Sequence, residues 1–286
     1  MSIDHDLENT VFDFIPNTAE SAFLGMIKGL ESHLNDYKVK RIQELGNDIN
    51  PDDLRRIVEL RPRVEKIITK DVKMRTFIAD DSSRDEMVAH VYDITYGTLN
   101  AGVDTLVCID DSIVRGTTLK KSILRMLERL GPRKIVIVSS APQIRYPDCY
   151  GIDMSQIEKL VAFQAAIELL RERGMVDTID KVYRKIVAMR NENAMDKANV
   201  VQEIYAPFTE EEISAKITDI VRPEDFTCEL EVMFQSLDSL AEAIPNHRGD
   251  WYFSGNYPTP GGNRVVNQAF LNFYEGKNER AYQHLM

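Results

Sequence analysis

The sequence predicts an α/β fold with a mainly parallel sheet flanked by helices. Strand-like apolar runs alternate along the chain with segments in which apolar residues recur at helical spacing. In the clearest unit, the run TLVCID is followed by a short loop, a helical segment and a second run, KIVIVSSA. Two near-continuous apolar strands joined by a helix are typical of a parallel sheet that is covered on both faces.

Length and composition narrow the class of protein. The 286 residues, 43% of them hydrophobic, can fill a sizeable core in one large domain or two small ones. A formal net charge of -11 argues against a nucleic-acid partner, because such binding draws much of its affinity from basic side chains. The three cysteines, Cys108, Cys149 and Cys228, are widely spaced, which favours a reducing compartment and no structural zinc. With no signal-peptide pattern and no run of about 18 apolar residues, we expect a cytoplasmic protein that makes no membrane contact.

The first third of the chain predicts a strand, a turn and a helix, followed by further strands. TVFDFI reads as a strand, PNTAE as a turn and SAFLGMIKGLESHL as a helix with one buried face. Asn50 and Pro51 mark the start of a second helix. The runs VEKIIT and MRTFIA read as strands, whereas residues 87–96 are compatible with either a helix or a strand.

The rest of the chain completes the predicted sheet and adds helices. A helix is expected from about residue 117 to residue 130, ended by Gly131 and Pro132. Residues 155–223 predict two to four surface-packed helices, and the aromatic, glycine-rich and proline-rich segment after them ends in a helix. We therefore expect a core at 1–162, a helical insertion or subdomain at 163–225, and a C-terminal segment at 226–286 that packs on the core.

Two adjacent carboxylates, Asp110 and Asp111, directly follow the apolar strand. The carboxyl edge of a parallel sheet is where open α/β folds bind ligands, and vicinal sugar hydroxyls or hydrated Mg²⁺ are natural partners for carboxylates. Gly116 allows close backbone approach, and Thr117 or Thr118 can cap a helix whose free amides face an anion. This combination fits a ribose phosphate. The alternative is that the aspartates merely end a strand.

Two common nucleotide-binding motifs are absent. The sequence contains no G-x-x-x-x-G-K-[ST] and no G-x-G-x-x-G. It therefore supports neither a P-loop nor a dinucleotide-binding fold.

Residues 107–118, VCIDDSIVRGTT, resemble the phosphoribosyl pyrophosphate (PRPP) loop of type I phosphoribosyltransferases. The form SIVRGTT is similar to that of the glutamine PRPP amidotransferases. Four further patches resemble the same family and occur in its order: IPNTAES, MRTFI, YPDCYGIDM and YFSGNYPT. The resemblance spans most of the chain, although residues 163–226 have no counterpart.

The resemblance implies a type I phosphoribosyltransferase fold and an enzyme, a pentosyl-transferring glycosyltransferase of de novo purine biosynthesis. Such enzymes replace the pyrophosphate of PRPP with ammonia to give 5-phosphoribosylamine. The implied catalytic residues are Asp110, Asp111 and Arg75, with the two aspartates holding Mg²⁺ directly or through water. The implied substrate-binding residues are Ser112, Val114, Arg115, Gly116, Thr117 and Thr118 at the phosphate, Asn17 and Thr18 in the pyrophosphate loop, and Lys70 beside the flexible loop.

The same resemblance implies partners and leaves alternatives open. We expect a glutaminase domain or subunit as a partner, because that domain does not precede the first strand, and ammonia as the substrate of this chain alone. Purine nucleotide inhibitors and a homo-oligomer are also implied. Three cysteines cannot supply the four ligands of the iron–sulfur cluster found in some members, so we expect no cluster.

Departures from the family keep another class of function open. Asn17 stands where an acidic residue is usual, and the flexible loop offers only Arg84 and His90 as basic residues. Asn17 argues against a metal ligand in the pyrophosphate loop. The altered flexible loop favours a non-catalytic, PRPP-binding or nucleotide-binding regulatory module on the same fold. A base-salvaging phosphoribosyltransferase is the third alternative, but it should lack the YGIDM and FSGNYPT segments.

Overall fold

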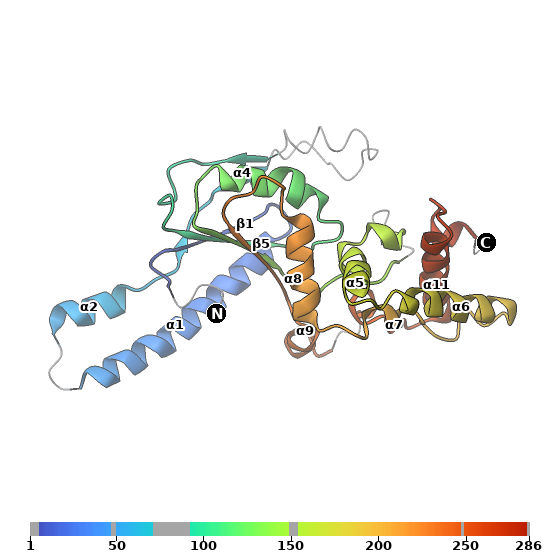
Figure 1. Cartoon of the computed structure of the whole chain (residues 1–286). Coiled ribbons are helices and arrows are strands. Elements are labelled where there is room, and N and C mark those ends of the chain that lie inside the picture. Colours follow the sequence, from blue (N-terminus) through green and yellow to red (C-terminus); the bar gives the residue numbers. More distant parts are fainter. Residues whose placement is uncertain (1–5, 47–49, 71–91, 149–153, 247–248, 285–286) are drawn as a thin grey trace. The chain divides into compact units, whose positions relative to one another are not determined.

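The computed structural model describes residues 6–46, 50–70, 92–148, 154–246 and 249–284 (Figure 1). The chain forms two compact units that share it discontinuously. The first unit consists of Met1–Asp111, Thr118–Ser140 and Pro223–Glu231, and the second of Ser112–Thr117, Ala141–Arg222 and Val232–Met286. The expected division into three parts at residues 162 and 225 stays a prediction.

A five-stranded sheet has the order β2-β1-β5-β6-β7. Its strands are β1 (Thr10–Phe14), β2 (Arg63–Val64), β5 (Thr105–Asp110), β6 (Lys134–Ser139) and β7 (Glu229–Phe234). The pairings of β1 with β2, of β1 with β5 and of β5 with β6 are all parallel, and β1 and β5 run side by side (Figure 1). The predicted α/β class with a parallel sheet is therefore confirmed.

The strand order reverses direction beside β1. From β1 the chain moves to β2 on one side, and it later crosses to β5 on the other side. Such a reversal is a topological switch point, and open α/β sheets bind their ligands at the carboxyl ends of the strands beside it.

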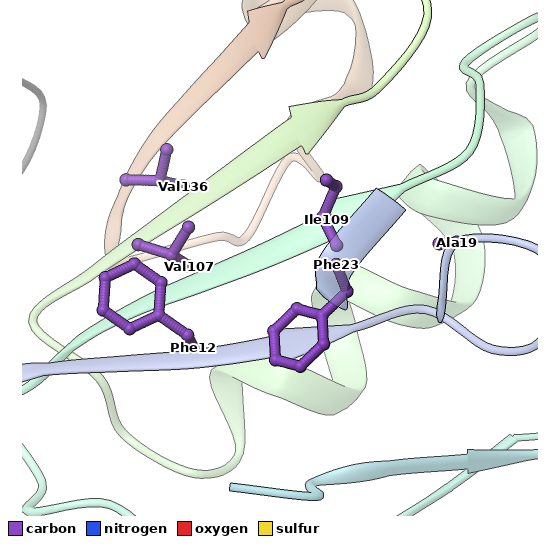
Figure 2. Close-up of a cluster of buried hydrophobic side chains, with 6 residues drawn as sticks. All are labelled: Phe12, Ala19, Phe23, Val107, Ile109 and Val136. Atoms are coloured by element: carbon purple, nitrogen blue, oxygen red, sulfur yellow. The ribbon is translucent and has the colours of Figure 1, made fainter. Parts of the chain in front are cut away.

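The core of the first unit lies between this sheet and the start of α1 (Glu20–Leu45). Figure 2 shows the six buried side chains of this cluster: Phe12, Ala19, Phe23, Val107, Ile109 and Val136. Ala19 and Phe23, at the start of α1, meet side chains from three strands. The predicted helix is confirmed but runs longer than expected, and only Phe23 and Leu34 are buried along it.

Two further helical segments of the first unit follow the sequence signals. In α2 (Pro51–Glu59), the Asn50 side chain accepts a hydrogen bond from the backbone N–H of Asp52, as its N-cap position predicts. After the Asp110–Asp111 pair, a π-helical turn (Leu119–Ile123) continues into α4 (Leu124–Glu128). The chain then turns at Gly131, whose φ of 70° is a left-handed angle that favours glycine.

A separate antiparallel hairpin lies in the sequence between β2 and β5. It pairs β3 (Ile68–Lys70) with β4 (Tyr92–Ile94). The predicted strand VEKIIT is therefore broken, because β2 ends at Val64 and β3 begins at Ile68. Of the segment 87–96, which was compatible with a helix or a strand, residues 92–94 form a strand. The predicted strand MRTFIA lies outside the described residues.

The second unit is mainly helical. It contains α5 (Val161–Glu172), α6 (Asp177–Asn191), α7 (Gln202–Tyr205), α8 (Glu210–Val221), α9 (Leu237–Ala243), α10 (Trp251–Ser254) and α11 (Pro260–Tyr274). The expectation of surface-packed helices was wrong for α5, which is buried along most of its length. Its Phe163 ring meets the rings of Tyr205, Phe270 and Phe273 edge-on. Among the described residues of both units, no helix is long and apolar enough to cross a membrane.

Candidate functional site

The carboxyl ends of three parallel strands lie level at one edge of the sheet. The N–H of Ile15, just after β1, donates to the carbonyl of Ile109 at 2.8 Å. The N–H of Ser140, just after β6, donates to the carbonyl of Asp110 at 2.9 Å. These bonds bring the turn after β1, the two aspartates after β5 and the serine after β6 to one edge, at the switch point.

Asp110 and Asp111 form a partly buried pair of carboxyl groups. The Asp110 Oδ1 atom accepts a hydrogen bond from the N–H of Asp111 at 2.9 Å, and the Ser140 hydroxyl donates to the Asp111 carbonyl at 3.1 Å. Burial, together with the neighbouring Asp111 charge, raises the pKa of Asp110 to about 8. An approaching cation would lower this pKa again, so the pair is suited to binding a cation or the hydroxyls of a sugar.

The β3–β4 hairpin brings two more polar groups to the aspartates. Lys70 and Tyr92 are cross-strand partners, and the Lys70 ammonium lies 5.1 Å from the centre of the Tyr92 ring. Burial and the charges of Asp110 and Asp111 raise the pKa of the Tyr92 phenol to about 12. The phenol is therefore protonated at neutral pH and can donate a hydrogen bond.

The structure places the predicted residues Asn17 and Thr18 in the exposed turn that leads from β1 into α1. The peptide bond between Pro16 and Asn17 is cis. Thr118 has helical backbone angles, and its side chain makes no cap hydrogen bond. Of the two residues expected to cap the helix, Thr117 or Thr118, Thr118 does not, since a capping residue has extended backbone angles.

The segment Ser112–Thr117 belongs to the second unit, where helices α5 and α8 hold it. The Val114 carbonyl accepts from the N–H of Val161 at 2.9 Å. Gly116 has a φ of 69°, and a Cβ built there would lie 2.7 Å from Val221 Cγ1. Gly116 is therefore fixed both by its backbone angle and by a close neighbour. Ser112, Val114 and Arg115 are partly buried and Thr117 is exposed.

The structure thus brings Asp110, Asp111 and Lys70 together in the first unit, with Asn17 and Thr18 at the same edge. The predicted residues Arg75, Arg84, His90 and Cys149 lie outside the described residues. Tyr92 was missed by the sequence analysis, because the segment around it has no strong periodicity that would place it in a strand.

The donor set fits a magnesium ion that is shared with a substrate. Among the described residues, no group of three or more His, Cys, Asp or Glu side chains could hold a metal ion. Asp110 and Asp111 would therefore supply one or two ligands, with water and substrate oxygens supplying the others. Mg²⁺ is commonly bound in this way, through one or two carboxylates and substrate phosphates.

No known family model matches the chain. The Haemophilus influenzae amidophosphoribosyltransferase is 34% identical to it over 110 residues, which is 38% of this chain and 21% of that protein. The Escherichia coli amidophosphoribosyltransferase is 42% identical over 64 residues, or 22% of this chain and 12% of that protein. Part of this chain is related to the amidophosphoribosyltransferases. The chain aligns with about a fifth or less of the length of these two relatives.

The chain also resembles two solved structures. One is the glutamine PRPP amidotransferase of Bacillus subtilis complexed with ADP and GMP, with 20% identity and a TM-score of 0.43. That comparison covers 88% of this chain and 38% of the other. A second, described as the allosteric regulatory enzyme of purine biosynthesis, has the same identity and TM-score and covers 90% and 39%.

Proposed function

We propose that this chain is the phosphoribosyltransferase part of an amidophosphoribosyltransferase, which replaces the pyrophosphate of PRPP with ammonia. The observation that carries the proposal is the pair Asp110–Asp111 at the carboxyl end of β5, at the switch point beside β1. Partial similarity to the amidophosphoribosyltransferases supports it independently.

In the proposed reaction, a bond forms between the ammonia nitrogen and the anomeric carbon. The bond from that carbon to the pyrophosphate oxygen breaks, its electron pair leaves with pyrophosphate, and the nitrogen loses a proton to give 5-phosphoribosylamine. Positive charge develops on the ribose ring as pyrophosphate leaves, so positioning and charge stabilisation carry the catalysis.

Each part of the site has a role in this proposal. Asp110 and Asp111 accept hydrogen bonds from the ribose hydroxyls, and their negative charge stabilises the cationic ring. Lys70 attracts the pyrophosphate oxygens, which Asn17 and Thr18 contact from the turn after β1. We assign residues 112–118 to binding of the monophosphate, through their side chains and backbone N–H groups, and Arg75 to catalysis.

Asp110 and Asp111 would hold Mg²⁺, directly or through water. When bound, the ion supplies charge neutralisation for the pyrophosphate leaving group. It would also restore the ionised state of Asp110, whose pKa is raised to about 8 without it.

The proposal is tested by measuring pyrophosphate release from PRPP with Mg²⁺, with and without ammonium chloride at alkaline pH. The test variant is Asp110→Asn combined with Asp111→Asn. The matched control is Asp52→Asn combined with Asp53→Asn, because it also neutralises two adjacent aspartates, but exposed ones in the first turn of α2. We expect ammonia-dependent release that survives in the control and is lost in the test variant.

The same experiment separates the proposed enzyme from the regulatory alternative. If PRPP binds with Mg²⁺ but no pyrophosphate is released above the level of the test variant, the transferase proposal fails for this chain. Binding without release would support a PRPP-binding or nucleotide-binding module instead. Absence of binding would reject both.

We further propose that purine nucleotides inhibit by occupying the PRPP site, and that a glutaminase domain or subunit supplies ammonia. Competitive inhibition by GMP in the same assay would support the first point. Glutamine-dependent release that appears only when a glutaminase subunit is added would support the second.

A further inference from the structure

Asp13 is a buried carboxyl group that the proposed chemistry does not use. It lies next to the last residue of β1, opposite Cys108 of β5, and its side chain has no exposed surface. Burial raises its pKa to about 6. Burying a carboxylate costs folding free energy unless its oxygens accept hydrogen bonds. The presence of Asp13 in an otherwise apolar strand therefore needs an explanation.

The reason lies in the backbone that Asp13 holds. Its Oδ2 atom accepts hydrogen bonds from the N–H of Ile67 at 3.1 Å and from the N–H of Ile68 at 2.8 Å. Its Oδ1 atom has no hydrogen-bond partner among the described residues. The buried Asp13 carboxylate thus accepts hydrogen bonds from two backbone N–H groups at the start of β3.

These two amides begin the hairpin that carries Lys70 and Tyr92. The Ile67 carbonyl accepts from the N–H of Thr95 at 2.9 Å. This bond joins the residue before β3 to the residue after β4. The hairpin forms a separate two-stranded sheet. The hydrogen bonds to Asp13 therefore link the hairpin to the main sheet, close to the strand that ends at Asp110.

We infer that Asp13 is a positioning residue for the candidate PRPP site. By fixing the start of β3 against β1, it sets where the Lys70 ammonium and the Tyr92 phenol lie relative to Asp110 and Asp111. The inference rests on the proposed function, because it assigns to the hairpin a part in binding PRPP.

The test compares Asp13→Leu, which removes both acceptor oxygens, with Asp13→Asn, which keeps one. Asp104→Leu is the matched control. Asp104 is also fully buried, but it lies at the opposite end of β5, where it accepts from Arg63 at 2.9 and 3.0 Å. All three variants are measured for melting temperature, for hydrogen exchange of the hairpin amides, and for PRPP affinity in the presence of Mg²⁺.

We expect Asp13→Leu to speed exchange at residues 67–70 and 92–95 and to weaken PRPP binding by about tenfold, since bonds to a charged acceptor are lost. Asp13→Asn should restore affinity to within about threefold of the wild type, because one acceptor oxygen remains. Asp104→Leu should lower the melting temperature while leaving hairpin exchange and PRPP affinity unchanged.

Two results would overturn the inference. In one, Asp13→Leu binds PRPP as tightly as the wild type although the protein is folded. In the other, Asp104→Leu weakens binding as much as Asp13→Leu, which would make the effect a general loss of stability. A wild-type chain that does not bind PRPP rejects the proposed function itself, and the exchange data still decide whether Asp13 anchors the hairpin.

Discussion

Replacing Gly116 with alanine should destabilise the second unit for two separable reasons. The φ of 69° is a left-handed backbone angle, which costs a residue with a Cβ atom about 1–2 kcal/mol. The new Cβ would also lie 2.7 Å from Val221 Cγ1 and 3.5 Å from Val161 Cγ2. Val221 is buried in α8, and a valine in a helix has one strongly preferred rotamer, so it cannot easily turn away.

The magnitude follows from adding the two costs. Forcing an extra carbon into a packed site costs about 1–3 kcal/mol, so Gly116→Ala should lose about 2–5 kcal/mol in total. Gly174 provides the matched control. Its φ is 66°, but a Cβ there would meet nothing within 4 Å. Gly174→Ala should therefore lose only the backbone cost of about 1–2 kcal/mol.

Unfolding in urea, followed by the fluorescence of Trp251, measures both variants. Trp251 is the single tryptophan, and it lies in the same unit as both glycines. Its indole N–H donates to Asp148 at 3.1 Å, so its signal should change when that unit opens. Equal losses in the two variants would refute the reasoning, because they would mean that the contact with Val221 adds no cost.

Three further predictions concern the site and one helix. Asp110→Asn should raise the melting temperature in EDTA at pH 9 but not at pH 4. The pKa of Asp110 in the folded state, about 8, exceeds the usual 3.8, so ionisation of this carboxyl destabilises the fold as pH rises. A pH-independent effect would contradict this prediction. Lys70→Met should weaken PRPP binding by about tenfold, measured by calorimetry with Mg²⁺, and unchanged affinity would exclude Lys70 from the site. Thr209→Ala should cost about 1 kcal/mol in denaturant unfolding, because it breaks the capping box with Glu212 at the start of α8, and an unchanged midpoint would count against it.

The central strand and the two aspartates at its end could be predicted because the signals are local. Four apolar residues followed by Asp110 and Asp111 predict a buried strand and the group at its end, and the structure has β5 ending at Asp110. The helix start at Asn50 and Pro51 is equally local and was predicted correctly. A feature that depends only on neighbouring residues can be predicted without knowing the rest of the fold.

The missed residues depend on contacts between distant segments. Asp13 interrupts the apolar strand TVFDF, and the partners of its carboxylate, the N–H groups of Ile67 and Ile68, lie more than fifty residues away in the sequence. Tyr92 faces the aspartates only because β4 pairs with β3. The strand β7 was also missed. Its place beside β6 depends on distant contacts, among them the ion pairs of Lys134 with Glu229 and Glu231.

The interleaving of the two units constrains how this chain can fold during synthesis. The edge strand β7 includes residues that return to the first unit only after residues 141–222 have been made. At about 5–20 residues per second, β6 waits for its neighbour for at least several seconds after leaving the ribosome. During that time β6 exposes an unpaired strand edge, which is a template for aggregation. A ribosome pause before β7 should therefore lower the soluble yield more than a pause after it.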